Sequence, residues 1–260
     1  MQRDRITAAI ITKNEEKNIR DCILSVKGWA DEIVVVDGYS TDSTTQIATE
    51  LGAKVISHRF EGDFSIERNI AMQNASGEWV LYLDADDRVT PDFKQKVDNI
   101  IGKDASVCIY KFKRKSFFLG HFMAYGGWYH YIPNLVNREK VKFEGALHER
   151  PVCDGKIGVI EGDIEHYPFN NITDFITRHN RYSSIEAKRI YDTEGACKFA
   201  QVRKNALSRT WKIFWKMYVK KSGHKEGMYG LIFSILFAFT NFLIWVKYWE
   251  LCEGNKVKQK

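Results

Sequence analysis

Three carboxylates follow a run of apolar and aromatic residues in the first third of the chain. Residues 79–83 (Trp-Val-Leu-Tyr-Leu) are typical of a strand buried on both faces, and Asp84, Asp86 and Asp87 come directly after it. Carboxylates at the end of a buried strand need a partner, because unpaired charge out of water is costly. Basic side chains or a hard divalent cation would serve, and Asp-x-Asp suits a cation with positions open for phosphate oxygens. A solvated turn followed by a helix cap at Thr90 is the alternative.

The elements that must position these carboxylates alternate between strands and helices. We expect strands at 6–11, 32–37, 53–57 and 79–83, and helices at 16–26, 64–75 and 91–101. A further helix is expected after the turn at 38–43 and ends at about residue 51. This alternation predicts a mostly parallel sheet, in which ligands bind at the carboxyl ends of the strands. Polar residues follow three strands, at Thr12–Glu15, Asp37 and Asp84–Asp87, so a common crevice is expected. No glycine-rich dinucleotide or P-loop motif follows the first strand, which disfavours both of those classes.

The pattern changes after residue 106. Strand-like stretches at 107–113, 133–143 and 156–165 predict an antiparallel extension of the sheet, and a helix is expected at 173–192 with Thr173 as its cap. The 260 residues fit one large domain, or one domain with an appendage. Five scattered cysteines without a C-x-x-C pair argue against a disulfide framework and a zinc site, and suit a reducing cytoplasm. No secretory signal is recognisable at the start of the chain.

The net charge of +6 is concentrated near the C-terminal end. Residues 198–225 contain nine Lys or Arg and no Asp or Glu, which indicates a local anionic partner. One helical face of this tract is apolar and aromatic; its members are Leu207, Trp211, Phe214, Trp215 and Tyr218. Such a helix is typical of a membrane interface, and packing on the catalytic domain is the alternative. No recognisable nucleic-acid module accompanies the tract, so a nucleic-acid partner is not expected.

Residues 227–246 carry no charge over a length that could span a bilayer. Small and polar residues (Gly227, Gly230, Ser234, Ala238 and Asn241) form a seam along one side, which could pack on protein. We favour a peripheral, interfacial helix; a single span and a buried or dimer-forming helix are the alternatives. Either membrane reading places the protein on the cytoplasmic face of the inner membrane, with an anionic membrane surface as partner.

Four segments resemble the motifs of glycosyltransferase family 2, in the usual order and spacing. They are residues 10–16 (IITKNEE), 33–44 (IVVVDGYSTDST), 67–71 (ERNIA) and 83–87 (LDADD). The resemblance implies an α/β GT-A fold, a nucleotide-diphosphate sugar and a Mg²⁺ or Mn²⁺ cofactor. It divides the chain into a nucleotide-sugar-binding half (1–102), an acceptor-binding and catalytic half (103–170) and a C-terminal helical, membrane-associating region (171–260). The remainder of the chain resembles the lipopolysaccharide inner-core β-glucosyltransferases of that family.

The resemblance also implies roles for residues on the donor side. Thr12, Asn14 and Glu15 would line the nucleoside site, Asp37 would read the base, and Arg68 would lie near the base or diphosphate. The chemistry agrees, because carboxylates accept hydrogen bonds from ribose hydroxyls and an imide N–H, and arginine donates to phosphate. Structural alternatives are a first-turn acid at Glu15, a helix cap at Asp37 and a surface position for Arg68.

The metal and acceptor sides are assigned in the same way. The resemblance implies Asp86 as direct metal ligand and Asp84 between metal and ribose, and Asp87 would serve the acceptor side or hold the turn. His166 is a further candidate for metal or diphosphate, with a structural role as the favoured alternative for a lone histidine. Transfer with inversion needs a base for the acceptor hydroxyl, and a carboxylate is the usual choice. Glu149 is favoured, with His148 orienting it, although relatives often have an acidic pair where this chain has His-Glu. Pairing of Glu149 with a basic side chain is the alternative.

The glycine-hinged aromatic loop supplies two more candidates. Trp128 and Tyr129 follow two glycines and could stack on a sugar ring, with ordinary core packing as the alternative. The resemblance implies an inverting metal-dependent transferase that moves a sugar, with UDP-glucose the favoured donor, to a lipid-linked saccharide of lipopolysaccharide-core type. Transfer to a polyprenyl phosphate or a protein is a second hypothesis, and a non-catalytic sugar-nucleotide-binding protein is a third.

Overall fold

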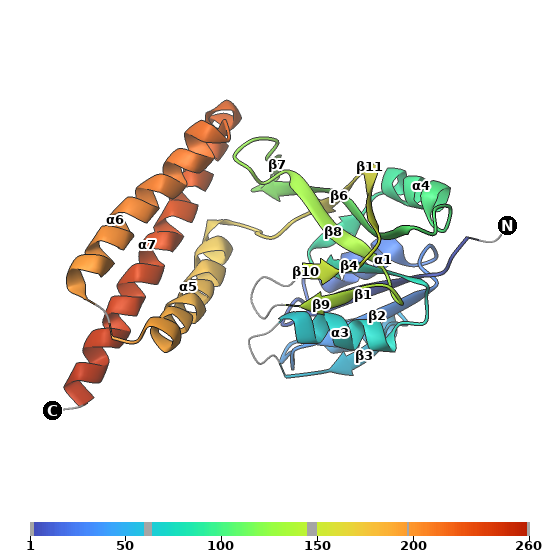
Figure 1. The fold of residues 1–260 in the computed structure, drawn as a ribbon, viewed down its shortest axis with the longest axis horizontal. Coiled ribbons are helices and arrows are strands. Elements are labelled where there is room, and N and C mark those ends of the chain that lie inside the picture. The colour runs from blue at the N-terminus through green and yellow to red at the C-terminus, as the bar shows by residue number, and fades with distance from the viewer. Residues whose placement is uncertain (1–2, 60–63, 145–149, 197, 259–260) are drawn as a thin grey trace. The chain divides into compact units, whose positions relative to one another are not determined.

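The computed structural model describes residues 3–59, 64–144, 150–196 and 198–258. The chain forms two compact units (Figure 1). The first comprises residues 1–115 and 130–166, and the second comprises residues 116–129 and 167–260.

The first unit is built on one large sheet. Its first four strands lie in the order β3 (Lys54–Ser57), β2 (Glu32–Asp37), β1 (Ile6–Thr12) and β4 (Trp79–Asp84), and neighbouring strands are parallel. The sheet continues with β8 (His130–Asn137), β6 (Val107–Phe118), β11 (Lys156–His166) and β5 (Asp87–Val89). Strand β8 is antiparallel to both β4 and β6, and β11 is antiparallel to β5. The parallel half and the antiparallel extension expected from the sequence are both confirmed.

Helices cover both faces of this sheet (Figure 1). They are α1 (Ile19–Val26), α2 (Thr44–Glu50), α3 (Phe64–Asn74) and α4 (Pro91–Ile100). Side chains of a strand alternate between faces, so Leu81 and Leu83 join the core formed with α1 and α4, whereas Val80 and Tyr82 join the core formed with α3. Two covered faces explain why these strands are apolar throughout. Thr90 caps α4, because its Oγ1 accepts a hydrogen bond from the Phe93 amide at 3.2 Å.

The first unit also contains a short strand pair and a disulfide. Strands β9 (Lys142–Glu144) and β10 (Arg150–Val152) form an antiparallel pair, and Phe143 of β9 packs edge-on against Tyr82 of β4. A disulfide joins Cys108 of β6 to Cys153, which the sequence argument against a disulfide framework did not foresee. Cysteine spacing along the chain does not report which segments become neighbours in the fold.

The second unit is mainly helical. It contains α5 (Ile172–Glu194), α6 (Phe199–Phe214), a π-helix (Trp215–Lys220), a short 3₁₀-helix (Gly223–Glu226) and α7 (Gly227–Lys258), together with β7 (His121–Phe122), which pairs with the end of β6. Helix α7 packs against both α5 and α6. The cap of α5 is Asn171, which accepts from the Asp174 amide at 2.8 Å, so the expectation of Thr173 is wrong.

Helix α7 has one packed side and one exposed side. Ser234 and Ala238 of the predicted small-residue seam are buried. A side chain at Gly230 would place its Cβ 1.8 Å from the carbonyl oxygen of Gly223, so the close approach there requires glycine. Among the described residues, one helix, Gly223–Gly254, is long and apolar enough to cross a membrane; an 18-residue stretch of it has a mean hydropathy of 1.9.

Candidate active site

The carboxyl ends of three parallel strands bring the predicted donor-side residues to one edge of the sheet. In the strand register, Thr12 of β1 lies opposite Asp37 of β2, and Ile11 of β1 lies opposite Asp84 of β4. Thr12 and Asp37 are almost fully buried, whereas the side chain of Asp84 is 48% exposed. A polar edge of this kind is where open α/β sheets bind ligands.

An arginine from the antiparallel half of the sheet holds two of the three aspartates. The Nη2 of Arg114, on β6, lies 2.8 Å from Asp84 and 2.7 Å from Asp87. Asp87 is fully buried and also accepts a hydrogen bond from the Asp84 amide at 2.9 Å. Asp87 therefore fixes the turn after β4, one of the two roles expected for it.

The electrostatics of this group are uneven. Partial desolvation raises the pKa of Asp84, but the positive charges of Arg114, Arg68 and His166 outweigh it, so the pKa is lowered. Burial raises the pKa of Asp87 well above its ordinary value, and the neighbouring carboxylates of Asp84 and Asp86 add to this effect against the opposing influence of Arg114. One arginine thus does not balance the carboxylates that converge here.

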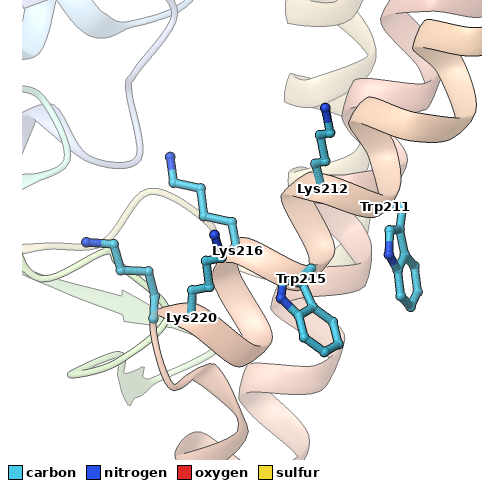
Figure 2. Close-up of a pocket in the computed structure, with 6 residues that line it drawn as sticks. Trp211, Lys212, Trp215, Lys216 and Lys220 are labelled. Carbon is cyan, nitrogen blue, oxygen red and sulfur yellow. The ribbon is translucent and has the colours of Figure 1, made fainter.

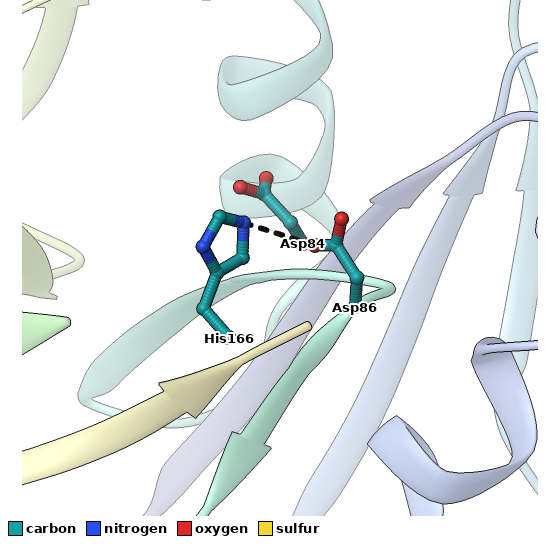
Figure 3. Close-up of side chains that lie close together, drawn as sticks. All are labelled: Asp84, Asp86 and His166. Carbon is teal, nitrogen blue, oxygen red and sulfur yellow. Dashed lines mark ion pairs between the residues drawn. The ribbon is translucent and has the colours of Figure 1, made fainter. Parts of the chain in front are cut away.

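His166, Asp86 and Asp84 form a compact cluster of potential metal ligands (Figure 3). Strand β11 ends at His166, which lies opposite Asp87 in the β11–β5 register. Its Nε2 is 3.6 Å from Oδ1 of Asp86, and one ligand atom from each of the three residues lies within 4.8 Å of the others. Asp86 and His166 are buried. The structure therefore brings together the three residues that the sequence proposed for the metal.

The donor set of this cluster suits a divalent cation. Two carboxylates and one imidazole match the ligand preferences of Mn²⁺, and the carboxylates also suit Mg²⁺. Within the described part of the chain, Oδ1 of Asp87 and Oγ1 of Thr12 are buried at the same edge without a hydrogen-bond partner. Buried polar atoms of this kind call for a ligand, an ion or water. Three protein ligands would leave positions open for phosphate oxygens.

The loops after β1 and β2 are joined by hydrogen bonds on the nucleoside side of the site. The Asn14 amide donates to Oγ of Ser40, and the Asn14 side chain accepts from the Thr41 amide at 2.8 Å. Asn14 has a positive φ of 55°, a conformation that asparagine tolerates better than most residues. Asp37 accepts from both the amide and the hydroxyl of Ser40. Asn14 and Asp37 thus hold this loop pair in shape, whatever they contribute to a ligand.

Glu15 lies in the loop after β1, and Arg68 lies on α3. The carboxylate of Glu15 accepts from the side-chain amide of Asn18 at 2.7 Å, at the start of α1. The guanidinium of Arg68, on α3, lies over the rings of Tyr82 and Phe143, at 5.0 and 5.2 Å from their centroids. Aromatic rings thus hold the partly buried Arg68, whose charge acts on Asp84, and its role toward a ligand stays a prediction.

The remaining candidates belong to the second unit or lie outside the described residues. Trp128 and Tyr129 belong to the second unit, where Trp128 packs against Phe233 with ring centroids 4.4 Å apart and Tyr129 packs edge-on against Phe122. Trp128 therefore has the core contacts given above as the alternative to sugar stacking. His148 and Glu149 lie outside the described residues.

Arg114 is the functional residue that the sequence reading missed. It stands on the same face of β6 as Phe112, Ser116 and Phe118, all of which are buried. An arginine in register with buried positions is unusual without a partner. The two-residue spacing from Phe112 to Phe118 was the signal in the sequence that Arg114 is largely buried. The lysines on both sides of Arg114 obscured this signal.

The fold and this site define the GT-A class of glycosyltransferases. The family model for glycosyl transferase family 2 matches residues 7–154, more than half of the chain. The chain belongs to glycosyltransferase family 2 and is an enzyme of that class.

Two relatives of the chain are also named glycosyltransferases. An uncharacterized glycosyltransferase of Rickettsia typhi, RT0209, is 30% identical over 264 residues, covering 95% of this chain and 87% of the relative. The SPbeta prophage-derived glycosyltransferase SunS of Bacillus subtilis is 32% identical over 186 residues, covering 70% of this chain and 40% of the relative.

Solved structures that resemble the chain include two synthases. One is glucosyl-3-phosphoglycerate synthase from Mycobacterium tuberculosis in complex with Mn²⁺, uridine diphosphate and glucosyl-3-phosphoglycerate (TM-score 0.46, 18% identity, 72% of this chain and 79% of that one). The other is mannosyl-3-phosphoglycerate synthase from Rubrobacter xylanophilus (TM-score 0.46, 17% identity, 75% and 77%).

Replacing Arg114 tests its part in the site. In Arg114→Met two carboxylates lose their shared cation, and breaking such a buried pair costs about 3–5 kcal/mol of unfolding free energy. We expect urea denaturation to show this loss at neutral pH. The loss should shrink at acidic pH, where protonated carboxyls need no cation. Lys115→Met, on the opposite face of β6, is the control and should stay within about 1 kcal/mol of wild type. Equal stability of the two variants would show that Arg114 does not hold the carboxylates.

Proposed function

We propose that the protein is an inverting, metal-dependent glycosyltransferase that moves glucose from UDP-glucose to a lipid-linked saccharide of lipopolysaccharide-core type. The observation that carries the metal-dependent part is the cluster of Asp84, Asp86 and His166 at the carboxyl edge of the parallel sheet. The donor sugar and acceptor class rest on the sequence resemblance alone. Residues 1–102 would bind the sugar nucleotide, and residues 103–170 would bind the acceptor.

The donor side follows from the chemistry of its residues. Asp86 and His166 would hold Mg²⁺ or Mn²⁺, with Asp84 shared between the cation and the ribose. When bound, the cation offsets the charge that develops on the leaving diphosphate. Asp37 and Glu15 offer acceptor oxygens to the imide of uracil and to ribose hydroxyls, and Arg68 offers donors to phosphate.

The acceptor side depends on a general base. Glu149 would remove the proton from the acceptor hydroxyl as it attacks the anomeric carbon, and His148 would orient it. The base assignment rests on the sequence resemblance. The described strands β9 and β10, on either side of this segment in the sequence, form a pair in which Glu144 lies opposite Arg150, and Phe143 contacts Tyr82, two residues before Asp84.

The C-terminal region would hold the enzyme at the cytoplasmic face of the inner membrane. Helix α7 packs along α5, whose 23 residues include eight with charged side chains. A span by α7 would draw these charges toward hydrocarbon, which is costly. The peripheral arrangement leaves them in water, so we favour it over a span.

The metal role is tested by Asp86→Asn. Wild-type protein should release UDP from UDP-glucose with Mn²⁺, faster than it releases nucleotide from other sugar nucleotides. Loss of an outer-shell partner of a metal ligand already costs about 10–100-fold. Loss of a direct ligand should therefore lower the release by at least about 100-fold. Asp92→Asn, an exposed carboxylate on α4, is the control and should match wild type. Unchanged turnover in Asp86→Asn would remove Asp86 from the metal site, and no release by wild type would favour a non-catalytic binding protein.

The base is tested by Glu149→Gln, which keeps the shape of the side chain and removes its basicity. General bases contribute about 10²–10⁴-fold, so transfer to a saccharide acceptor should fall by that amount while UDP binding, followed by calorimetry, stays near wild type. Glu139→Gln, an exposed glutamate in the turn before β9, is the control. Parallel loss of UDP binding and transfer would mean that Glu149 supports the fold instead. Transfer to a polyprenyl phosphate or a protein, but to no core saccharide, would select the second acceptor hypothesis.

A further inference from the structure

An open hollow of about 780 Å³ lies on the surface of the helical second unit (Figure 2). Its lining residues come from the end of α6, the π-helix and the residue that follows; they are Trp211, Lys212, Trp215, Lys216, Lys220 and Lys221. We call this hollow the Trp-Lys groove. It combines two indole rings with four ammonium groups, a combination that nothing in the sugar-transfer chemistry requires.

The apolar side of the groove is not used by the fold. Helix α6 contributes Val202 and Ala206 to the core that it forms with α7. On its other side, Trp211 is 61% exposed and Trp215 is 44% exposed. Exposed indoles at successive turns form an apolar surface that is open to a partner.

The polar side of the groove carries charge of one sign. Lys212, Lys216 and Lys220 extend away from the two indoles, as Figure 2 shows. The sequence from 198 to 225 holds no acidic residue, and Glu226, the next acid, is bonded to His121 and to the Tyr125 amide. The lysines are therefore not neutralised by acids within their own segment.

The π-helix helps to keep these lysines together. Four residues carry an α-helix slightly past one full turn, whereas the wider π-helix falls slightly short of one. The π-helix begins at Trp215, between Lys212 and Lys216, so the rotation per residue decreases along the stretch that carries Lys216 and Lys220. Lys221 closes the end of the groove, where its carbonyl accepts from the Gly126 amide at 2.8 Å.

We propose that the Trp-Lys groove is a binding site for an anionic phospholipid in the membrane surface. The indoles and the methylene stems of the lysines would contact the upper acyl region, and the ammonium groups would meet the lipid phosphate. An acidic peptide would satisfy the charges but would leave the paired indoles without an apolar partner, and no recognisable nucleic-acid module accompanies the basic tract. The proposal deepens the membrane location proposed above and does not depend on the transfer reaction.

Sedimentation with lipid vesicles tests the proposal on the full-length protein. Wild type should bind vesicles of phosphatidylcholine mixed with phosphatidylglycerol and should bind phosphatidylcholine alone weakly. Each lysine near an anionic surface is worth about fivefold in binding, so Lys212→Gln with Lys216→Gln should weaken binding roughly 25-fold. High salt should abolish this difference, whereas Trp211→Ala with Trp215→Ala should weaken binding at any salt concentration.

A control with the same change in net charge separates the site from the overall charge of the protein. Lys27→Gln with Lys103→Gln, two exposed lysines of the first unit, should bind vesicles as wild type does. Equal weakening in this control, or wild-type binding by the groove variants, would overturn the proposal. Displacement of the protein from vesicles by inorganic phosphate at constant ionic strength would also overturn it, by showing an anion site without lipid specificity. Nucleotide release from UDP-glucose in solution, measured on the same variants, reports separately on the proposed transferase activity.

Discussion

The carboxyl end of β4 gathers three carboxylates, and one arginine pairs with two of them. Asp84, Asp86 and Asp87 converge within four positions of the chain, and Arg114 forms ion pairs with two of them. Arg114 keeps its proton there, because the attraction of Asp87 and Asp84 outweighs the burial that would lower its pKa. Asp86 lies beside His166, and the donor set of Asp84, Asp86 and His166 suits a divalent cation.

This constraint explains how the two halves of the sheet depend on each other. The parallel half delivers Asp84 at the end of β4, and the antiparallel half delivers Arg114 on β6, His166 on β11 and Asp87 on β5. Neither half contains a complete site. The apolar strands and the helices on both faces fix the strand register, and a strand shifted by one residue would turn every one of these side chains to the other face. Packing therefore determines the positions on which the site chemistry depends.

Much of this arrangement could be predicted from the sequence, because local patterns encode it. Buried parallel strands read as continuous apolar runs, and the polar residues after them mark the ligand edge. Other features depend on contacts between distant segments, such as the Arg114 ion pairs and the Cys108–Cys153 disulfide. The α5 cap was missed by two residues, because Asn171 and Thr173 are both good capping residues and tertiary contacts choose between them. Trp128 was ambiguous for the same reason, since an indole packs equally well on a sugar ring or on Phe233.

Anomalous diffraction at the manganese absorption edge, from crystals grown with MnCl₂ and UDP, tests the metal assignment most directly. We expect a peak about 2–2.3 Å from a carboxylate oxygen of Asp86 and from Nε2 of His166, with diphosphate oxygens completing the coordination. A peak at other residues, or UDP bound with no peak beside Asp86, would contradict it.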